Sequence, residues 1–268
     1  MKDILVTYVQ GEKFLSNFDC EVFLHSISRY KSFHKLCIVK DITEESKKNL
    51  SKYFDFVIDP VHPINVPNCD RFMSYYEWLV KNNNYEYVFH VDFRDIIIQK
   101  NPFEYMRKNP EYNMFITTEG MKISESECNL FWARDFNKLL QAHRNDYTNH
   151  MILNTGTIGA KLDTFLNICL LLFTNTNRLA PHVVFEQPVF NYLYPYFVTN
   201  PLIKICHPYE SDFIATGEGI KRGFIDVKFN GKQVVNKNDE PYYVVHQWDR
   251  LDYAEKIRDN KRNTFSLI

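Results

Sequence analysis

Two carboxylates three residues apart, Asp92 and Asp95, directly follow an apolar run in this sequence. The run, residues 87–91, has the composition of a buried strand. In open α/β sheets, ligands bind just beyond the carboxyl ends of the strands. Hard cations such as Mg²⁺ and Mn²⁺ prefer carboxylate oxygens together with substrate phosphates. The pair therefore predicts a site for a divalent cation and the phosphates that it carries. The alternative is an acidic turn that Arg94 neutralises.

Strands and helices alternate through the first part of the chain, where they must position these acids. Strands are predicted at residues 4–8, 36–39 and 56–58, with a fourth ending at Asp92. Helices are predicted from caps at Ser16 and Asn17 to about residue 30, after a cap at Thr43, and at about residues 70–80. Strands alternating with helices of this length imply βαβ units and a mainly parallel sheet. We therefore expect an α/β, Rossmann-like fold whose mainly parallel central sheet is flanked by helices.

The alternation is less regular beyond Asp95. Further elements are predicted at residues 114–117 (strand), 135–142 (helix), 152–153 (strand, leading into Asn154), 162–173 and 187–193 (helices), 227–235 (a hairpin about Asn230-Gly231) and 242–245 (strand, leading into His246). No repeat or linker interrupts the sequence. We therefore expect one domain over residues 1–268, with a nucleotide-binding half at 1–100 and an acceptor-binding half at 101–268.

The composition is that of an ordinary globular protein. Hydrophobic residues make up 45% and charged residues 24% of the 268, and the net charge of -1 gives no electrostatic footprint for nucleic acid or an anionic membrane. The six cysteines are scattered without a CxxC pair, which argues against structural zinc and fits free thiols in a reducing compartment. The sequence has no signal-peptide anatomy and no apolar run of about 20 residues, so we expect no transmembrane segment and a cytoplasmic location.

Two common nucleotide-binding patterns are missing. The first predicted strand is not followed by GxGxxG, which disfavours a dinucleotide cofactor, and no P-loop is present. In the form Asp92-Phe93-Arg94-Asp95, the acidic pair resembles the DxD signature of the GT-A glycosyltransferases, which use nucleotide-sugar donors. It is similar to the glycosyltransferase domain of collagen lysyl hydroxylases and to viral and bacterial relatives with a D-x-R-D core. Residues 99–103 (QKNPF) also match those relatives.

The resemblance implies a GT-A fold and a set of site residues. A late histidine completes the metal shell in this group, so Asp92, Asp95 and His246 are expected to hold Mn²⁺ or Mg²⁺; a histidine satisfied within the core is the alternative. Asn154-Thr155-Gly156 is similar to the N-[ST]-G strand end that faces the donor sugar, which makes Asn154 a candidate catalytic residue and Gly156 a donor-binding one. The alternative for this segment is a tight strand-to-helix turn.

Six further residues complete the candidate donor site. Glu186-Gln187 matches a D-Q pair beside the donor sugar, with Glu in place of the usual Asp, so Glu186 could orient the acceptor hydroxyl or accept its proton; the alternative is a helix-start acid that meets the helix dipole. Arg71 is expected to reach the donor, or else to be a solvated helix arginine. Arg250 could bind the diphosphate or pair with Asp249. Thr7 and Tyr8 are expected to face the nucleotide, with Tyr8 stacking on the base.

These residues predict a metal-dependent glycosyltransferase. The donor would be a nucleoside-diphosphate sugar, with UDP the commoner nucleotide, and the acceptor a hydroxyl of a glycan, a lipid-linked glycan or a protein. Resemblance to collagen-modifying and glycogenin-like enzymes favours retention of anomeric configuration. Two alternatives are a non-catalytic glycan-binding protein on the same fold and a sugar-phosphate nucleotidyltransferase. The latter normally needs a glycine-rich, basic loop after the first strand, where residues 9–13 hold one glycine.

Overall fold

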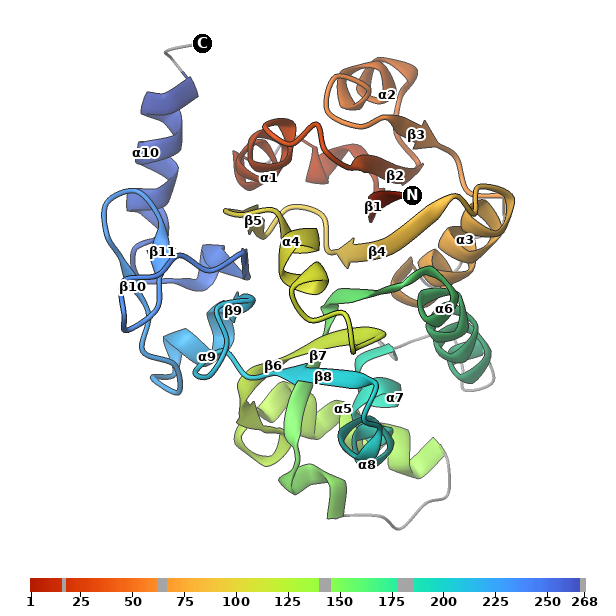
Figure 1. Ribbon diagram of the computed structural model, residues 1–268, viewed down its shortest axis with the longest axis vertical. Helices are drawn as coiled ribbons and strands as arrows, with labels where there is room; N and C mark the ends of the chain where they lie inside the picture. Colours follow the sequence, from red (N-terminus) through yellow and green to blue (C-terminus); the bar gives the residue numbers. More distant parts are fainter. Residues whose placement is uncertain (16–17, 62–66, 140–145, 178–185, 266–268) are drawn as a thin grey trace.

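The computed structural model describes residues 1–15, 18–61, 67–139, 146–177 and 186–265. Within these residues a seven-stranded central sheet has the order β3-β2-β1-β4-β7-β6-β8 (Figure 1). Its strands are β1 (Lys2–Gln10), β2 (His34–Lys40), β3 (Phe56–Ile58), β4 (Tyr85–Val91), β6 (Met114–Lys122), β7 (Met151–Lys161) and β8 (Ile203–Cys206). Neighbouring strands pair in parallel except for β7, which runs antiparallel to both β4 and β6. The predicted α/β class and mainly parallel sheet are confirmed.

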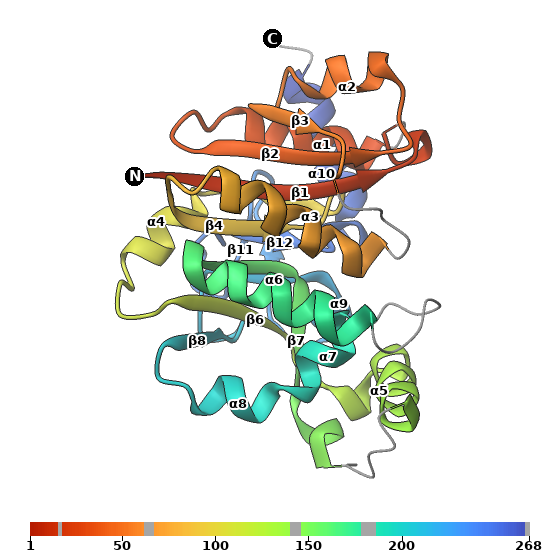
Figure 2. The ribbon, with the colours of Figure 1, turned by 90° about the vertical axis from the view of Figure 1, so that its right-hand side faces the viewer.

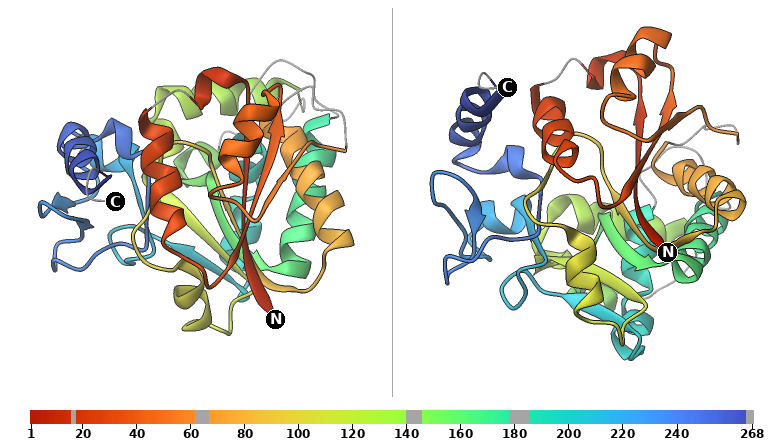
Figure 3. Two further views of the ribbon diagram at one scale, coloured as in Figure 1. Left: turned by 90° about the horizontal axis from the view of Figure 1, so that it is seen from above. Right: turned by 45° about the horizontal axis from the view of Figure 1, so that its top comes forward.

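Helices cover both faces of this sheet (Figure 3). The helices of the described residues are α1 (Phe18–Ser28), α2 (Glu44–Leu50), α3 (Pro67–Lys81), α4 (Pro102–Arg107), α5 (Glu127–Leu139), α6 (Leu162–Asn177), α7 (Glu186–Tyr192), α8 (Tyr194–Thr199), α9 (Gly217–Lys221) and α10 (Ala254–Phe265), with short 3₁₀ turns η1 (Glu12–Phe14), η2 (Ile123–Glu125), η3 (Asp146–Asn149) and η4 (Trp248–Arg250). Of these, α10 lies away from the central sheet and contacts α1 and η4 (Figure 1). Figure 2 shows α3 and α6 side by side on one face. Thr43 caps α2 as expected, its side chain accepting from the Ser46 amide, whereas the predicted caps Ser16 and Asn17 lie outside the described residues.

The two faces of the sheet bury separate apolar cores. Alternate residues of β1 supply them, with Ile4, Val6 and Tyr8 in one core and Leu5 and Val9 in the other. A strand buried on both faces reads as a nearly continuous apolar run, which is why this part of the sequence predicted its strands well.

A second, smaller sheet has the order β5-β12-β9 and consists of β5 (Ile96–Ile98), β12 (Val244–His246) and β9 (Ile214–Thr216). Strand β12 pairs antiparallel with β5, where His246 is opposite Ile96, and parallel with β9. Strand β5 was not predicted, because three isoleucines are too short a run for a strand signal. The predicted hairpin is confirmed as β10 (Lys228–Phe229) and β11 (Val234–Val235), with Gly231 at a φ of 89°.

Asn154-Thr155-Gly156 lies within β7 and not at a strand end or a strand-to-helix turn, so both of those expectations are wrong. Residues 157–161 continue the strand by pairing with β4, and α6 begins only at Leu162. Between the pairs Ile116–Ile158 and Thr118–Leu153, β6 advances two residues while β7 advances five. The segment therefore forms a bulge, a feature that often re-aims side chains beside active sites.

Two further predictions differ from the structure in their bounds. The predicted helix at 135–142 begins earlier, with α5 at Glu127, and residues 140–142 lie outside the described part. The predicted strand at 114–117 continues to Lys122. All six cysteines lie within the described residues, and none forms a disulfide bond. Among the described residues, every helix is too short or too polar to cross a membrane.

Candidate active site

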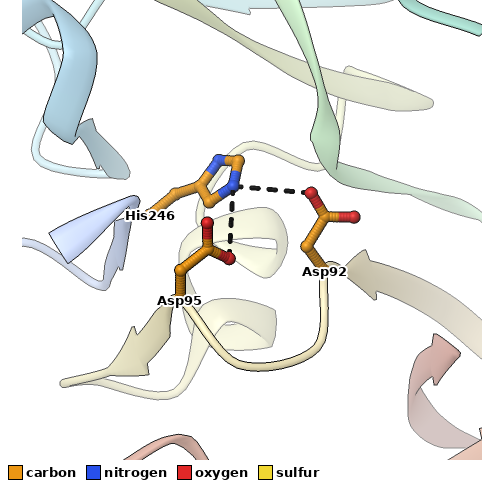
Figure 4. Close-up of side chains that lie close together, drawn as sticks. All are labelled: Asp92, Asp95 and His246. Atoms are coloured by element: carbon orange, nitrogen blue, oxygen red, sulfur yellow. Dashed lines mark ion pairs between the residues drawn. The ribbon is translucent and has the colours of Figure 1, made fainter. Parts of the chain in front are cut away.

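The side chains of Asp92, Asp95 and His246 converge on one point (Figure 4). Nε2 of His246 lies 3.6 Å from Oδ2 of Asp92 and 3.8 Å from Oδ1 of Asp95. One ligand atom from each residue lies within 4.8 Å of the other two. Asp92 follows β4, Asp95 precedes β5 and His246 ends β12. The pairing of β5 with β12 therefore brings together acids and an imidazole that are far apart in the sequence.

Gly156 leaves the space that this convergence requires. A Cβ atom at this position would lie 2.4 Å from Oδ2 of Asp92 and 2.4 Å from Cε1 of His246. The carbonyl oxygen of Gly156 also accepts a hydrogen bond from the Asp92 amide at 2.8 Å. Gly156 also lines a cavity beside this cluster, so the expected contact of its backbone with the donor stays a prediction.

The charges of the three residues affect one another. Burial opposes a positive charge on His246, but the carboxylates of Asp95 and Asp92 raise its pKa above the ordinary value. Burial likewise opposes the charge on Asp92, whose pKa is lowered by Arg71 and His246. Burial raises the pKa of Asp95. Two carboxylate oxygens and one imidazole nitrogen facing a common point form a donor set that fits Mn²⁺ or a similar divalent ion.

Arg94, between the two acids, has a φ of 100°, which is rare for a residue with a long side chain. Its guanidinium lies 3.3 Å from Asp249 and 3.8 Å from Asp95. The alternative of an acidic turn neutralised by Arg94 thus describes Asp95 in part, but Asp92 has another partner. Strained backbone of this kind is concentrated at active sites and ligand clamps.

That partner is Arg71, which is buried in α3. Its Nη1 lies 2.6 Å from Oδ1 of Asp92 and its Nη2 lies 3.6 Å from Oε1 of Glu186. The two carboxylates raise the pKa of Arg71 although burial opposes its charge. The alternative of a solvated helix arginine is wrong, since Arg71 is only 6% exposed. We call Asp92, Asp95 and His246 the metal-type cluster. The guanidinium of Arg71 therefore links this cluster to Glu186, the residue that begins α7.

Replacing Glu186 by glutamine is expected to remove a pH dependence of folding stability. Burial raises the pKa of Glu186 to about 7, from an ordinary value of 4.5. Between these values the folded state keeps a proton that the unfolded state loses, so stability falls as pH rises. From about pH 4.5 to about pH 8, wild type should lose about 3 kcal/mol of unfolding free energy relative to Glu186→Gln. Urea denaturation across this range measures the difference, and parallel stability curves for the two proteins would contradict it.

Glu119, near the end of β6, organises the polar side chains beside Glu186 and was missed in the sequence. Its Oε1 accepts a hydrogen bond from Nδ2 of Asn154 at 2.9 Å and another from Nε2 of Gln187 at 3.4 Å. Burial raises the pKa of Glu119. A signal was present, because Glu119 follows the apolar run at 114–116 as Asp92 follows its own strand. Two polar residues, Thr117 and Thr118, separate the apolar run from Glu119, and the predicted strand therefore ended too early, at Thr117.

Gln187 is held on both sides of its amide. Its Nε2 donates to Oδ1 of Asn129 at 2.8 Å, and its Oε1 accepts from the backbone amide and hydroxyl of Thr155. Asn154 accepts at Oδ1 from the hydroxyl of Thr157 at 3.3 Å. The side-chain amides of Asn154 and Gln187 therefore belong to one hydrogen-bond network with Glu119, and this network fixes the orientations of both amides.

Two cavities meet at this cluster, and both are lined by Asn68, Arg71 and Asp92. The larger, of about 690 Å³, also contacts the carboxyl end of β1 and the η1 turn. The smaller, of about 270 Å³, is lined by the bulge of β7, by Glu119 and Glu186, and by His246. The metal-type cluster thus lies where the larger cavity and the smaller, more polar cavity meet.

The remaining predicted residues divide between these cavities and the core. Tyr8 lines the larger cavity, and its hydroxyl donates to Oε1 of Gln10 at 2.9 Å. Thr7 is fully buried and lines neither cavity, since the larger cavity contacts β1 only from Tyr8 to its carboxyl end. Arg250 lines the smaller cavity and pairs at 3.3 Å with Glu218, and not with Asp249.

Comparison with known proteins supports the fold. No protein-family model matches this sequence, and no curated protein sequence matches it. The structure is similar to one described as the crystal structure of a glycosyltransferase involved in the glycosylation of the major capsid of PBCV-1, with a TM-score of 0.50. The alignment covers 98% of this chain and 100% of that chain at 12% sequence identity. At this identity the likeness shows the fold, and the chain has the α/β fold of that glycosyltransferase.

Proposed function

We propose that this protein is a metal-dependent glycosyltransferase of the GT-A type. It would transfer a sugar from a nucleoside-diphosphate donor, with UDP the favoured nucleotide, to a hydroxyl group of an acceptor. The observation that carries the proposal is the convergence of Asp92, Asp95 and His246 at the junction of two cavities, on a glycosyltransferase fold. A single domain, with a donor-binding first half and an acceptor-binding second half, fits this arrangement.

Asp92, Asp95 and His246 would hold Mn²⁺ or Mg²⁺, which when bound neutralises charge on the departing diphosphate. The larger cavity has the size for a nucleoside, and there Tyr8 and Phe14 offer aromatic surface for the base. Arg71 lines both cavities, so its guanidinium can stabilise negative charge that develops where they meet. The sugar would occupy the smaller cavity.

Glu186 and Asn154 flank the space in which the sugar would react. With a pKa of about 7, the Glu186 carboxyl can both accept and release a proton near neutral pH. Asn154, held by Glu119, is positioned to bind a sugar hydroxyl. Retention of configuration is expected from the resemblance to retaining relatives, and the anomeric proton of the product reports it by NMR.

Replacing Asp95 by alanine is expected to abolish cation-dependent hydrolysis of the donor. A screen of UDP- and GDP-sugars with added Mn²⁺ should identify a donor that the wild type hydrolyses slowly without an acceptor. Loss of a direct ligand should reduce this rate by at least about 100-fold, since even residues that only orient ligands are worth about 10- to 100-fold. Asp59→Ala, which removes an exposed carboxylate from an ion pair with Lys47, is the matched control and should keep the full rate.

Three outcomes would replace the proposal. Equal turnover by wild type and Asp95→Ala would end the metal hypothesis. Cation-dependent release of pyrophosphate from a nucleoside triphosphate and a sugar phosphate would identify a nucleotidyltransferase. Binding of glycans with no turnover of any nucleotide sugar would identify a non-catalytic protein on the same fold.

A further inference from the structure

A third cavity, of about 910 Å³, shares no lining residue with the larger cavity or with the smaller cavity beside Glu186 (the reaction cavity). Its walls are the segment that follows β8, the residues after α9, and the loop beyond β11. Figure 1 shows α9 and the β10–β11 hairpin on the same side of the molecule. Nothing in the proposed reaction uses this cavity, although it is larger than both cavities at the metal-type cluster.

Two aromatic side chains at this cavity are partly open to solvent. Tyr209 is 46% exposed and Phe224 is 42% exposed. The ring of Tyr209 stacks on that of His207 with centroids 5.2 Å apart and planes inclined by 20°. His207 is itself fixed, since its Nδ1 lies 3.2 Å from the hydroxyl oxygen of Thr118. The pair therefore forms a flat, pre-positioned surface of the kind that binds the apolar face of a planar or ring-shaped ligand.

The polar lining of the cavity carries both charges. Its ionisable and amide side chains are Lys204, Lys237, Glu210, Asp212, Asp226, Glu240, Asn236 and Asn238. Burial lowers the pKa of His207, which makes it a neutral group near pH 7. The four carboxylates outnumber the two lysines, although Asp212 also pairs with Lys100 at 2.9 Å, so the lining disfavours an anionic ligand. Donors and acceptors around an aromatic surface suit a neutral ligand with many hydroxyl groups.

Residues adjacent in the sequence line this cavity and the reaction cavity. Arg222 lines the reaction cavity and Gly223 lines this one. At a second point, Thr118 contacts His207 of this cavity while the next residue, Glu119, lines the reaction cavity. A chain of a few sugar units with its terminal hydroxyl beside Glu186 would therefore continue past these residues toward Tyr209.

We infer that this cavity is a subsite for an acceptor chain made of neutral sugars, bound by stacking on Tyr209 and Phe224. The role of this ligand as an acceptor rests on the proposed glycosyl transfer. Binding of the glycan to the cavity can be measured without any reaction. It also gives a preference among the acceptor types, because a glycan chain fills both cavities.

The test is binding of the complete protein to immobilised cellohexaose, maltohexaose and xylohexaose, with an oligogalacturonate and a peptide library as alternative probes. Wild type should bind at least one neutral oligosaccharide. Tyr209→Ala and Phe224→Ala should each weaken that binding by about 10-fold or more, as expected for a central aromatic contact. Tyr196→Ala, which removes a ring that is 62% exposed on α8, is the matched control and should bind as wild type does.

The inference is overturned if no neutral oligosaccharide binds, if only the acidic chain or peptides bind, or if Tyr209→Ala binds unchanged. Hydrolysis of the donor without acceptor should be the same in wild type and Tyr209→Ala. Asp95→Ala should lose that hydrolysis yet keep oligosaccharide binding. Tyr209-dependent binding in a protein that turns over no donor would leave this site standing and reject the proposed function alone.

Discussion

Gly156→Ala is expected to reduce cation-dependent activity by about 10- to 100-fold while the protein still folds, because the new methyl group displaces Asp92 or His246, the proposed metal ligands. Its Cβ would lie 2.4 Å from both Oδ2 of Asp92 and Cε1 of His246, and 2.9 Å from Nε2 of the same imidazole. Real Cβ atoms do not approach this closely, so at least one of the two side chains must move. Titration with Mn²⁺, followed by donor hydrolysis, measures the loss.

Gly159→Ala is the matched control on the same strand. A Cβ there would lie 2.6 Å from Sδ of Met106, the end of a flexible side chain in the core, and away from the metal-type cluster. This variant should lower thermal stability with little effect on the Mn²⁺ concentration needed for activity. If both variants lost activity in proportion to their stability, the steric role assigned to Gly156 would be wrong.

Arg71→Met is expected to lower the free energy of unfolding by about 3 to 5 kcal/mol, since removing one partner of a buried ion pair leaves a charge uncompensated. Here two carboxylates are affected, Asp92 at 2.6 Å and Glu186 at 3.6 Å. The guanidinium is also the cation that both cavities share, so donor hydrolysis should fall as well. Urea denaturation gives the stability and the hydrolysis assay gives the activity.

Two further variants separate charge from geometry at this position. Arg71→Lys keeps the charge but has no planar fork to reach both carboxylates, and it should lose less stability than Arg71→Met. Adding Glu186→Gln to Arg71→Met removes one uncompensated charge and should recover part of the stability at pH 8, though not the activity. Equal stability of the single and double variants would show that Glu186 is not coupled to Arg71.

The sequence predicted the parts of this molecule whose signals are local. The buried strands around Val6 and Phe89 read as apolar runs, the turn at Asn230-Gly231 indicated a hairpin, and the acids after a strand marked two members of the cluster that could hold a metal ion. The meeting of His246 with the two acids rested on a resemblance, because no local pattern states which distant strand will pair with residues 96–98.

What the sequence did not reveal depends on tertiary pairing. The bulge at Asn154-Thr155-Gly156 arises from the register of β7 against two neighbours, and neither register is encoded within the segment. Glu119 belongs to β6, which continues through polar residues beyond its apolar run. The predicted strand ended before Glu119 because it was recognised by that apolar run alone. Thr7 was misplaced because the larger cavity reaches β1 only from Tyr8 onward, and no local pattern tells where a cavity begins along a strand.

The small sheet has a consequence for when the site exists at all. Each of its strands is three residues long, and His246 is 151 positions after Asp95 in the chain (246 − 95). Elements with so few backbone hydrogen bonds open locally at a lower free energy than the long strands of a core. Each such opening would carry the imidazole away from the carboxylates while the large sheet stayed intact. An ion that binds only when all three side chains are in place would oppose this opening by mass action. Ion binding would therefore stabilise the small sheet that positions His246 for that binding.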